Sequence, residues 1–157
     1  MGQTTFSGPV RSERGFTAVG STAVVEITAE TTLTYADHVG RIIEVNDADG
    51  AVTLPAITSD TIGATYKFFI GTTATDLDIK TDGTDKFSGN LVLAASATSQ
   101  SRGFAPGATN DVISMNGTTT GGIAGSVIEV TAIGADEYLV TGTLLGSGTL
   151  ATPFADS

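Results

Sequence analysis

The chain has 157 residues and a formal charge of −10, with 7 lysines and arginines, 17 aspartates and glutamates, and no cysteine. The length suits one domain with a substantial core, and the lack of cysteine excludes disulfides, thiolate metal centres and a thiol nucleophile. The acidic charge argues against nucleic acid as a partner, because phosphate contacts need clustered lysine and arginine. No apolar run resembles a secretory signal or a membrane helix, so we expect a soluble chain made in the cytoplasm without a membrane partner.

The first 20 residues show no strand-like alternation, and we predict that residues 1–20 form an extended N-terminal arm. On the surface of a partner, its aromatic side chains would serve as apolar anchors and its arginines as charged contacts. The alternative is an arm that packs across its own domain. The candidate partner-binding residues are Phe6, Val10, Arg11, Arg14 and Phe16.

Residues 21–144 are rich in threonine, glycine and β-branched residues and show no sustained helical period. They predict an all-β domain, either a β-sandwich or a barrel-like domain of the jelly-roll or tulip type. Residues 145–157 are rich in glycine, serine, threonine and alanine and predict a C-terminal tail. Ten strands are expected, at residues 22–28, 31–35, 41–46, 51–54, 65–71, 76–80, 87–95, 111–115, 126–133 and 137–144.

The alternation of apolar and polar residues is clearest at 65–71 and 76–80, which we interpret as a pair in one sheet with one solvated face. The polar links 46–50 and 134–136 each separate two predicted strands by a few turn-forming residues. Both links therefore predict β-hairpins. Pro55 is expected to end its strand, because proline cannot donate a ladder hydrogen bond.

Few residues suit a hydrolase or a nucleotide site. His38, beside Asp37, is the only histidine that could activate a serine, and no Gly-x-Ser-x-Gly sequence is present. We therefore interpret His38 as a polar turn residue. The glycine-rich segment 117–125 lacks a lysine and precedes a strand, so it is interpreted as a loop and not as a phosphate site.

Clustered aspartates leave a second enzyme class open. Asp76 and Asp78, with Tyr66 and Tyr138, would be the candidate residues of a glycosidase or a carbohydrate-binding module. Aromatic residues make up only 6% of the chain and tryptophan is absent, which leaves little for a sugar platform. The alternative for these aspartates is a solvated strand face and turn capping.

Two acidic turns carry the oxygen ligands that calcium prefers, at residues 46–50 and 82–85. Neither turn has the ligand spacing of an EF-hand, and Asp82 and Asp85 have few neighbouring ligands. Calcium binding by these turns stays an alternative to plain Asp-rich turns. We expect no catalytic residue, no metal and no cofactor, and therefore a structural or binding protein instead of an enzyme.

Three segments of the body resemble a known family: Thr53-Leu-Pro-Ala56, Gly63-Ala-Thr-Tyr-Lys-Phe-Phe-Ile-Gly71 and Ile79-Lys-Thr-Asp-Gly-Thr-Asp-Lys-Phe-Ser-Gly89. Together with Phe6-Ser-Gly-Pro-Val-Arg11, they are similar to small structural proteins of tailed bacteriophages, the capsid decoration (cement or head-stabilising) proteins. The resemblance covers about residues 6–16 and 53–93.

The resemblance implies an all-β subunit, a homotrimer, that lies on the outside of the icosahedral head and binds neighbouring major capsid proteins through its arm. The expected location is therefore the virion exterior. The segment 117–125 and the C-terminal tail match nothing in this family, which leaves a head-fibre or a tail and receptor-binding component as the alternative.

Overall fold

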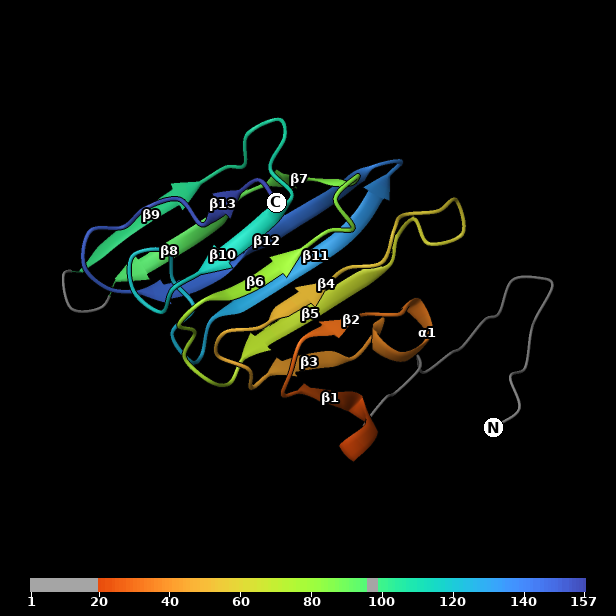
Figure 1. Cartoon of the computed structure of the whole chain (residues 1–157), viewed down its shortest axis with the longest axis horizontal. Coiled ribbons are helices and arrows are strands. Elements are labelled where there is room, and N and C mark those ends of the chain that lie inside the picture. Colours follow the sequence, from red (N-terminus) through yellow and green to blue (C-terminus); the bar gives the residue numbers. More distant parts are fainter. Residues whose placement is uncertain (1–19, 96–98) are drawn as a thin grey trace, which may run out of the picture.

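The computed structural model describes residues 20–95 and 99–157. The regular secondary structure of this part of the chain is almost entirely β, with 13 strands in two mixed sheets. Figure 1 shows the two sheets stacked on each other with their strands running in roughly the same direction, as in aligned sandwiches. The all-β prediction is confirmed in its sandwich form, since the described strands do not close into a barrel.

Sheet A has the strand order β1-β3-β5-β11-β12-β8-β9, and β7 also pairs with β12. Its strands are β1 (Val24–Ile27), β3 (Ile42–Val45), β5 (Thr65–Ile70), β7 (Lys86–Gly89), β8 (Leu91–Ala95), β9 (Gln100–Phe104), β11 (Val127–Gly134) and β12 (Glu137–Gly146). Sheet B has the order β13-β10-β6-β4-β2. Its strands are β2 (Thr31–Thr32), β4 (Ala51–Thr53), β6 (Leu77–Lys80), β10 (Val112–Met115) and β13 (Phe154–Ala155). A 3-10 turn, η1 (Ser21–Ala23), precedes β1, and a short helix, α1 (Tyr35–His38), follows β2.

The first six strands alternate between the two sheets and form three turns of a coil. Strands β1, β3 and β5 pair in parallel in sheet A, and β2, β4 and β6 pair in parallel in sheet B. The predicted hairpin at 46–50 is therefore wrong, because this link carries the chain from β3 to β4 in the other sheet. The predicted pairing of 65–71 with 76–80 is also wrong, since β5 and β6 lie in different sheets. Alternation shows that a strand has one buried face, but two strands that face each other across a core alternate in the same way.

The second half of sheet A is organised around β12. The hairpin predicted at 134–136 is confirmed, with β11 and β12 antiparallel. The other edge of β12 pairs in parallel with β7 and then with β8. Gly89, with φ 103°, lies where the chain passes from β7 to β8, and a Cβ there would lie 2.3 Å from the carbonyl oxygen of Val140. Only glycine fits this close approach.

All ten predicted strands are present within a few residues of their expected bounds, although 87–95 is divided into β7 and β8. Two further strands, β9 and β13, were not predicted. Strand β13 lies in the segment assigned to the tail and pairs with β10. In the same segment, Leu150 and Phe154 are buried, so these C-terminal residues contribute to the core.

The core lies between the two sheets and is made of alternate residues from both. Sheet A contributes side chains such as Ile43, Phe68 and Val140, and sheet B contributes Ile79 and Ile113. These side chains are 0–2% exposed. Burial of this apolar layer provides the main stabilisation of a chain that has no disulfide.

Candidate functional site: the outer face of sheet A

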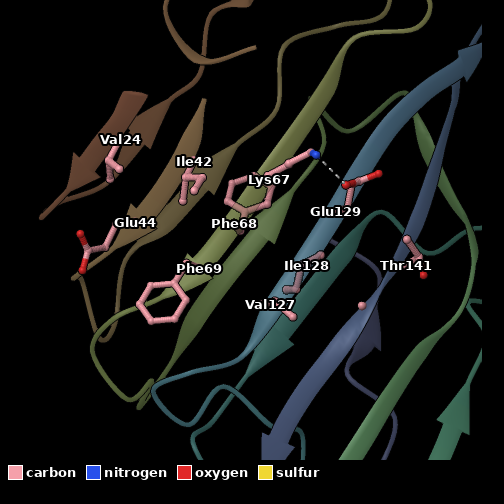
Figure 2. Close-up of a pocket in the computed structure, with 11 residues that line it drawn as sticks. Val24, Ile42, Glu44, Lys67, Phe68, Phe69, Val127, Ile128, Glu129 and Thr141 are labelled. Atoms are coloured by element: carbon pink, nitrogen blue, oxygen red, sulfur yellow. Dashed lines mark ion pairs between the residues drawn. The ribbon is translucent and has the colours of Figure 1, made fainter. Parts of the chain in front are cut away.

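The outer face of sheet A is unusually apolar for a solvent-facing surface. Val24, Ile42, Phe69 and Val127 come from four neighbouring strands and are 41%, 48%, 38% and 46% exposed. Strand register places Val24 opposite Ile42 and Phe69 opposite Val127, and Figure 2 shows these side chains along one side of the sheet. Contiguous exposed apolar patches of this kind mark interaction surfaces in soluble proteins.

These residues line an open groove of about 510 Å³, which we call the sheet A groove. It runs across β1, β3, β5 and β11, and Thr141 and Gly142 of β12 close its far side. Its lining residues belong to strands that pair with one another, so the groove is held by inter-strand hydrogen bonds. A groove of this kind is preformed and gives a partner a rigid apolar surface.

Charged side chains on the same face are distributed unevenly. Lys67 forms an ion pair with Glu129 at 3.4 Å, and both side chains are about half exposed. Glu26 lies directly opposite Glu44 in the register of β1 and β3. Glu26 accepts a hydrogen bond of 2.8 Å from the side-chain amide of Asn46. Among the described residues, the carboxylate of Glu44 has neither a hydrogen bond nor an ion pair, so this end of the groove carries negative charge without a cation.

This face was not predicted from the sequence, although the sequence carries a signal for it. Ile42-Ile43, Phe68-Phe69 and Val127-Ile128 are pairs of consecutive apolar residues within strands. Consecutive strand residues point to opposite faces, so each pair predicts one apolar side chain in the core and one outside. The five residues predicted to bind a partner, Phe6, Val10, Arg11, Arg14 and Phe16, lie outside the described residues.

The aspartates at residues 82 and 85 act within their own part of the fold. Asp82 accepts hydrogen bonds from the backbone amides of Thr84 and Asp85 and from the Thr84 hydroxyl. Burial opposes ionisation of Asp82, but these hydrogen bonds outweigh it and lower its pKa. The carboxylate of Asp85 accepts a hydrogen bond from the amide of Ile57 at 3.0 Å. Burial, together with the charges of Asp82 and Asp136, raises the pKa of Asp85.

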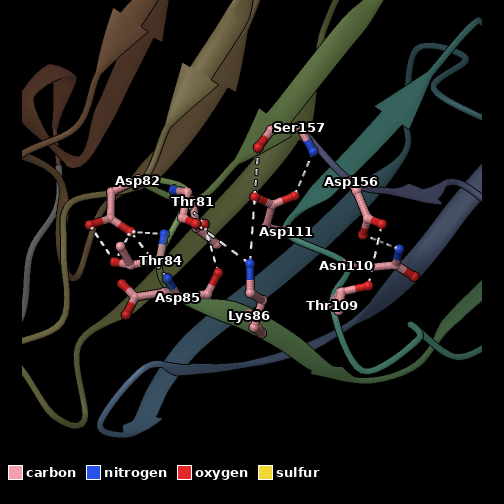
Figure 3. A network of polar contacts seen from close by, with 11 residues as sticks. Thr81, Asp82, Thr84, Asp85, Lys86, Thr109, Asn110, Asp111, Asp156 and Ser157 are labelled. Carbon is pink, nitrogen blue, oxygen red and sulfur yellow. Dashed lines mark hydrogen bonds and ion pairs between the residues drawn. The ribbon is translucent and has the colours of Figure 1, made fainter.

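A second polar contact holds the C-terminal segment to β10, and Figure 3 shows it beside the aspartate turn. Asp111, 3% exposed, accepts two hydrogen bonds of 2.8 Å from Ser157, one from the amide and one from the hydroxyl. Lys86 lies 3.8 Å from the same carboxylate. Burial alone would raise the pKa of Asp111, but the Ser157 hydrogen bonds and the Lys86 charge lower it. This contact therefore has a clear structural role.

The four candidate residues for sugar chemistry do not converge. Tyr66 and Tyr138 lie in the core with rings 6.5 Å apart, 0% and 1% exposed. Asp78 belongs to β6 and alternates with the buried Leu77 and Ile79, so it lies on the outer side of sheet B. Its Oδ1 atom is buried and has no hydrogen-bond partner among the described residues. Asp76 is exposed in the loop before β6.

His38 and Asp37 are both engaged with one threonine. The Nδ1 atom of His38 lies 3.0 Å from the backbone nitrogen of Thr34, and the Thr34 hydroxyl donates to the Asp37 carboxylate at 2.9 Å. These contacts fix the start of α1 and agree with a turn role for His38. Residues 117–125 form the predicted loop.

In the acidic link at 46–50, the amide of Asp49 donates to the Asp47 carboxylate at 3.4 Å. Residues 20–95 and 99–157 contain no group of three histidine, cysteine, aspartate or glutamate side chains placed to hold a metal ion. The same residues include no helix with the length and apolar character to cross a membrane.

The fold and its outer face define a two-sheet β-domain with an apolar groove and a coil of three parallel turns. Comparison with known proteins adds nothing to this description, since no family model, curated protein or solved structure matches the chain.

Proposed function

We propose that this chain is a structural virion protein without enzymatic activity. In this proposal it binds the outside of a bacteriophage head and stabilises contacts between major capsid proteins. The observation that carries the proposal is the apolar outer face of sheet A, where four large side chains are between 38% and 48% exposed. An exposed apolar surface of this kind marks an interaction site. The resemblance to capsid decoration proteins suggests that the partner is a major capsid protein.

The build of the domain suits this role. A decoration subunit needs a rigid body that presents a fixed surface, and the strands that line the groove are held by inter-strand hydrogen bonds. Binding a preformed surface avoids the entropy cost of ordering it. The aspartates and tyrosines considered for sugar chemistry do not come together at one site. This favours a binding role, because acid–base chemistry needs groups positioned around a reacting atom.

Association of several copies would make modest contacts sufficient. A homotrimer engages several sites at once, and each contact raises the effective concentration of the next. The N-terminal arm adds a second contact of the same chemistry, with apolar anchors at Phe6, Val10 and Phe16 and charges at Arg11 and Arg14. Arm and face together would bridge neighbouring capsid proteins.

The test is co-sedimentation of the purified protein with heads of the source phage that lack it. The wild-type chain is expected to saturate the heads. Phe69→Glu places a charge in the groove and is expected to weaken binding at least tenfold. Ile133→Glu is the matched control, because Ile133 is 45% exposed in the same sheet but does not line the groove. Its binding should stay near wild type.

The arm is tested in the same assay with the full-length variant Phe6→Ala/Phe16→Ala, which should also bind weakly. If the wild-type chain does not bind heads but binds host cells, the proposal is overturned in favour of a fibre or receptor-binding component. Equal binding by the Phe69→Glu variant and the wild type would overturn the role of the groove.

A further inference from the structure

The sheet A groove lies beside the point where the N-terminal arm enters the domain. Val24 lines the groove and is the first residue of β1. The described chain begins at Gly20, and η1 (Ser21–Ala23) joins it directly to β1. The 19 preceding residues thus connect to the rim of the groove through one short turn.

The reach of this segment is ample. An extended chain advances by at most ~3.5 Å per residue, so four residues before Gly20 span about 14 Å. The groove crosses β1, β3, β5 and β11, and three inter-strand spacings of ~4.8 Å amount to a similar distance. Residues near Phe16 can therefore reach every strand of the groove, and the more distal residues can lie along it.

The composition of the arm complements the groove. The groove offers apolar side chains from four strands, and the arm carries two phenylalanines and a valine at Phe6, Phe16 and Val10. An apolar groove that takes alternate side chains of an extended segment is a common mode of peptide recognition. Burying these arm residues and the groove together would remove both apolar surfaces from water.

The charges are complementary as well. Glu26 and Glu44 lie opposite each other at one end of the groove, and like charges in this position destabilise a sheet. Lys67, the basic residue among the groove-lining side chains, is paired with Glu129. The arm carries Arg11 and Arg14 against a single acidic residue, Glu13, in a chain that is otherwise strongly acidic. An arginine beside Glu44 would neutralise the unpaired charge.

We propose that, in the free subunit, the arm of the same chain lies in the sheet A groove. Its aromatic residues pack on Ile42, Phe69 and Val127, and its arginines lie beside Glu26 and Glu44. The same chain is the source because a tethered segment meets its own groove at an effective concentration in the millimolar range, well above that of an unassociated second copy at micromolar protein. This inference concerns the free protein and stands or falls separately from attachment to heads.

The test uses paramagnetic labelling, which the lack of native cysteine makes specific. Ser12→Cys places one label between Arg11 and Glu13 and leaves every proposed anchor in place. In the full-length, isotope-labelled protein, the amide signals of Ile42, Phe69 and Val127 are expected to lose most of their intensity, whereas those of β9, at the opposite edge of sheet A, should lose least. Phe69→Glu should restore the groove signals, and the control Ile133→Glu should not.

A mixing experiment identifies the source of the arm. Spin-labelled chains without isotope are mixed with isotope-labelled chains that carry no spin label. The proposal expects no loss of groove signals in this mixture. Loss in the mixture would show that the arm comes from a second copy and would overturn the proposal, and so would groove signals that keep their full intensity in the singly labelled chain.

Charge reversal gives an independent readout. Glu44→Arg should weaken the contact, and the groove signals should recover part of their intensity. Combining Glu44→Arg with Arg11→Glu and Arg14→Glu should bring the loss of signal back, because the charges are then exchanged across the same contact. Failure of this rescue would contradict the assignment of the arginines to the acidic end of the groove.

Discussion

The inner and outer faces of sheet A use the same residue types to different ends. Ile42 and Ile43 are neighbours in β3, yet the first is 48% exposed and the second is fully buried. The same contrast holds for Phe69 and Phe68 in β5 and for Val127 and Ile128 in β11. The inner residues pack between the two sheets, and the outer residues do not take part in that packing within the described domain. An apolar side chain in a strand therefore indicates a surface that becomes covered. The covering part can be the other sheet or a different segment or protein.

The largest expected effect is a difference in stability between substitutions at two adjacent positions, one on each face of sheet A. Ile43→Ala creates a cavity between the sheets and should lower the free energy of unfolding by about 2–5 kcal/mol. Ile42→Ala leaves the packing between the sheets intact, and its effect should be about 1 kcal/mol or less. Urea unfolding of the two variants measures the difference. Equal losses would mean that the outer face is as tightly packed as the core, and the comparison would fail.

A smaller difference is expected between a buried and an exposed carboxylate. Asp111→Asn weakens two hydrogen bonds from Ser157 and the contact with Lys86, and it should cost about 1.5–3 kcal/mol. Glu129→Gln breaks the exposed pair with Lys67 and should cost less than about 1 kcal/mol. Chemical denaturation at neutral pH compares the two variants.

The pH dependence of stability tests the same buried group. Because the pKa of Asp111 is lowered in the folded chain, its contribution is complete above the ordinary aspartate pKa of about 4. It is then lost as the pH falls through the lower pKa of the folded state. Asp111→Asn should therefore flatten the acid side of the stability profile, as measured by chemical denaturation at a series of pH values.

The smallest effect distinguishes two tyrosines inside the core. The hydroxyl of Tyr138 donates to the carbonyl oxygen of Pro55 at 2.6 Å, so Tyr138→Phe should cost about 1 kcal/mol. The hydroxyl of Tyr66 is buried and has no partner among the described residues. Tyr66→Phe should leave stability at neutral pH unchanged or slightly higher, because it removes an unsatisfied polar group.

Alkaline titration sharpens this pair. Burial, with a smaller contribution from Tyr35, raises the pKa of Tyr66 to about 12 from 10.0. The unfolded chain releases this proton first, so stability falls as the pH rises from about 10 to about 12. Tyr66→Phe should reduce that fall, as followed by unfolding at fixed pH values. An unchanged alkaline slope would contradict the raised pKa.

Much of the fold was predictable because strand formation is a local property. Alternation and turn residues located ten strands, and the three-residue link before Glu137 identified the β11–β12 hairpin. Strand pairing was harder, because the partner of a parallel strand lies a full turn of the coil away along the chain. The links 28–30 and 46–50 cross between sheets, and nothing in their composition distinguishes a crossing from a hairpin.

The two unpredicted strands have physical reasons. Strand β9 consists mostly of exposed polar residues at a sheet edge, such as Gln100 and Ser101, and lacks an alternating pattern. Strand β13 is two residues long and depends on contacts with β10 that are distant in sequence. In the candidate site, the apolar outer face could have been found from paired apolar residues such as Ile42-Ile43. The acidic end of the groove could not have been predicted, because it depends on the register of β1 and β3, which composition does not show.

The coil of β1 to β6 has an architectural consequence. Each turn lays one strand on each sheet, and the described coil stops at β1 and β2, which stand at the ends of their sheets. A duplicated turn could stack there without disturbing β11 or β12, because it would pair only with its immediate neighbour. Related proteins could thus differ in length by whole turns of the coil, each adding one strand to each sheet, while the antiparallel end stays constant.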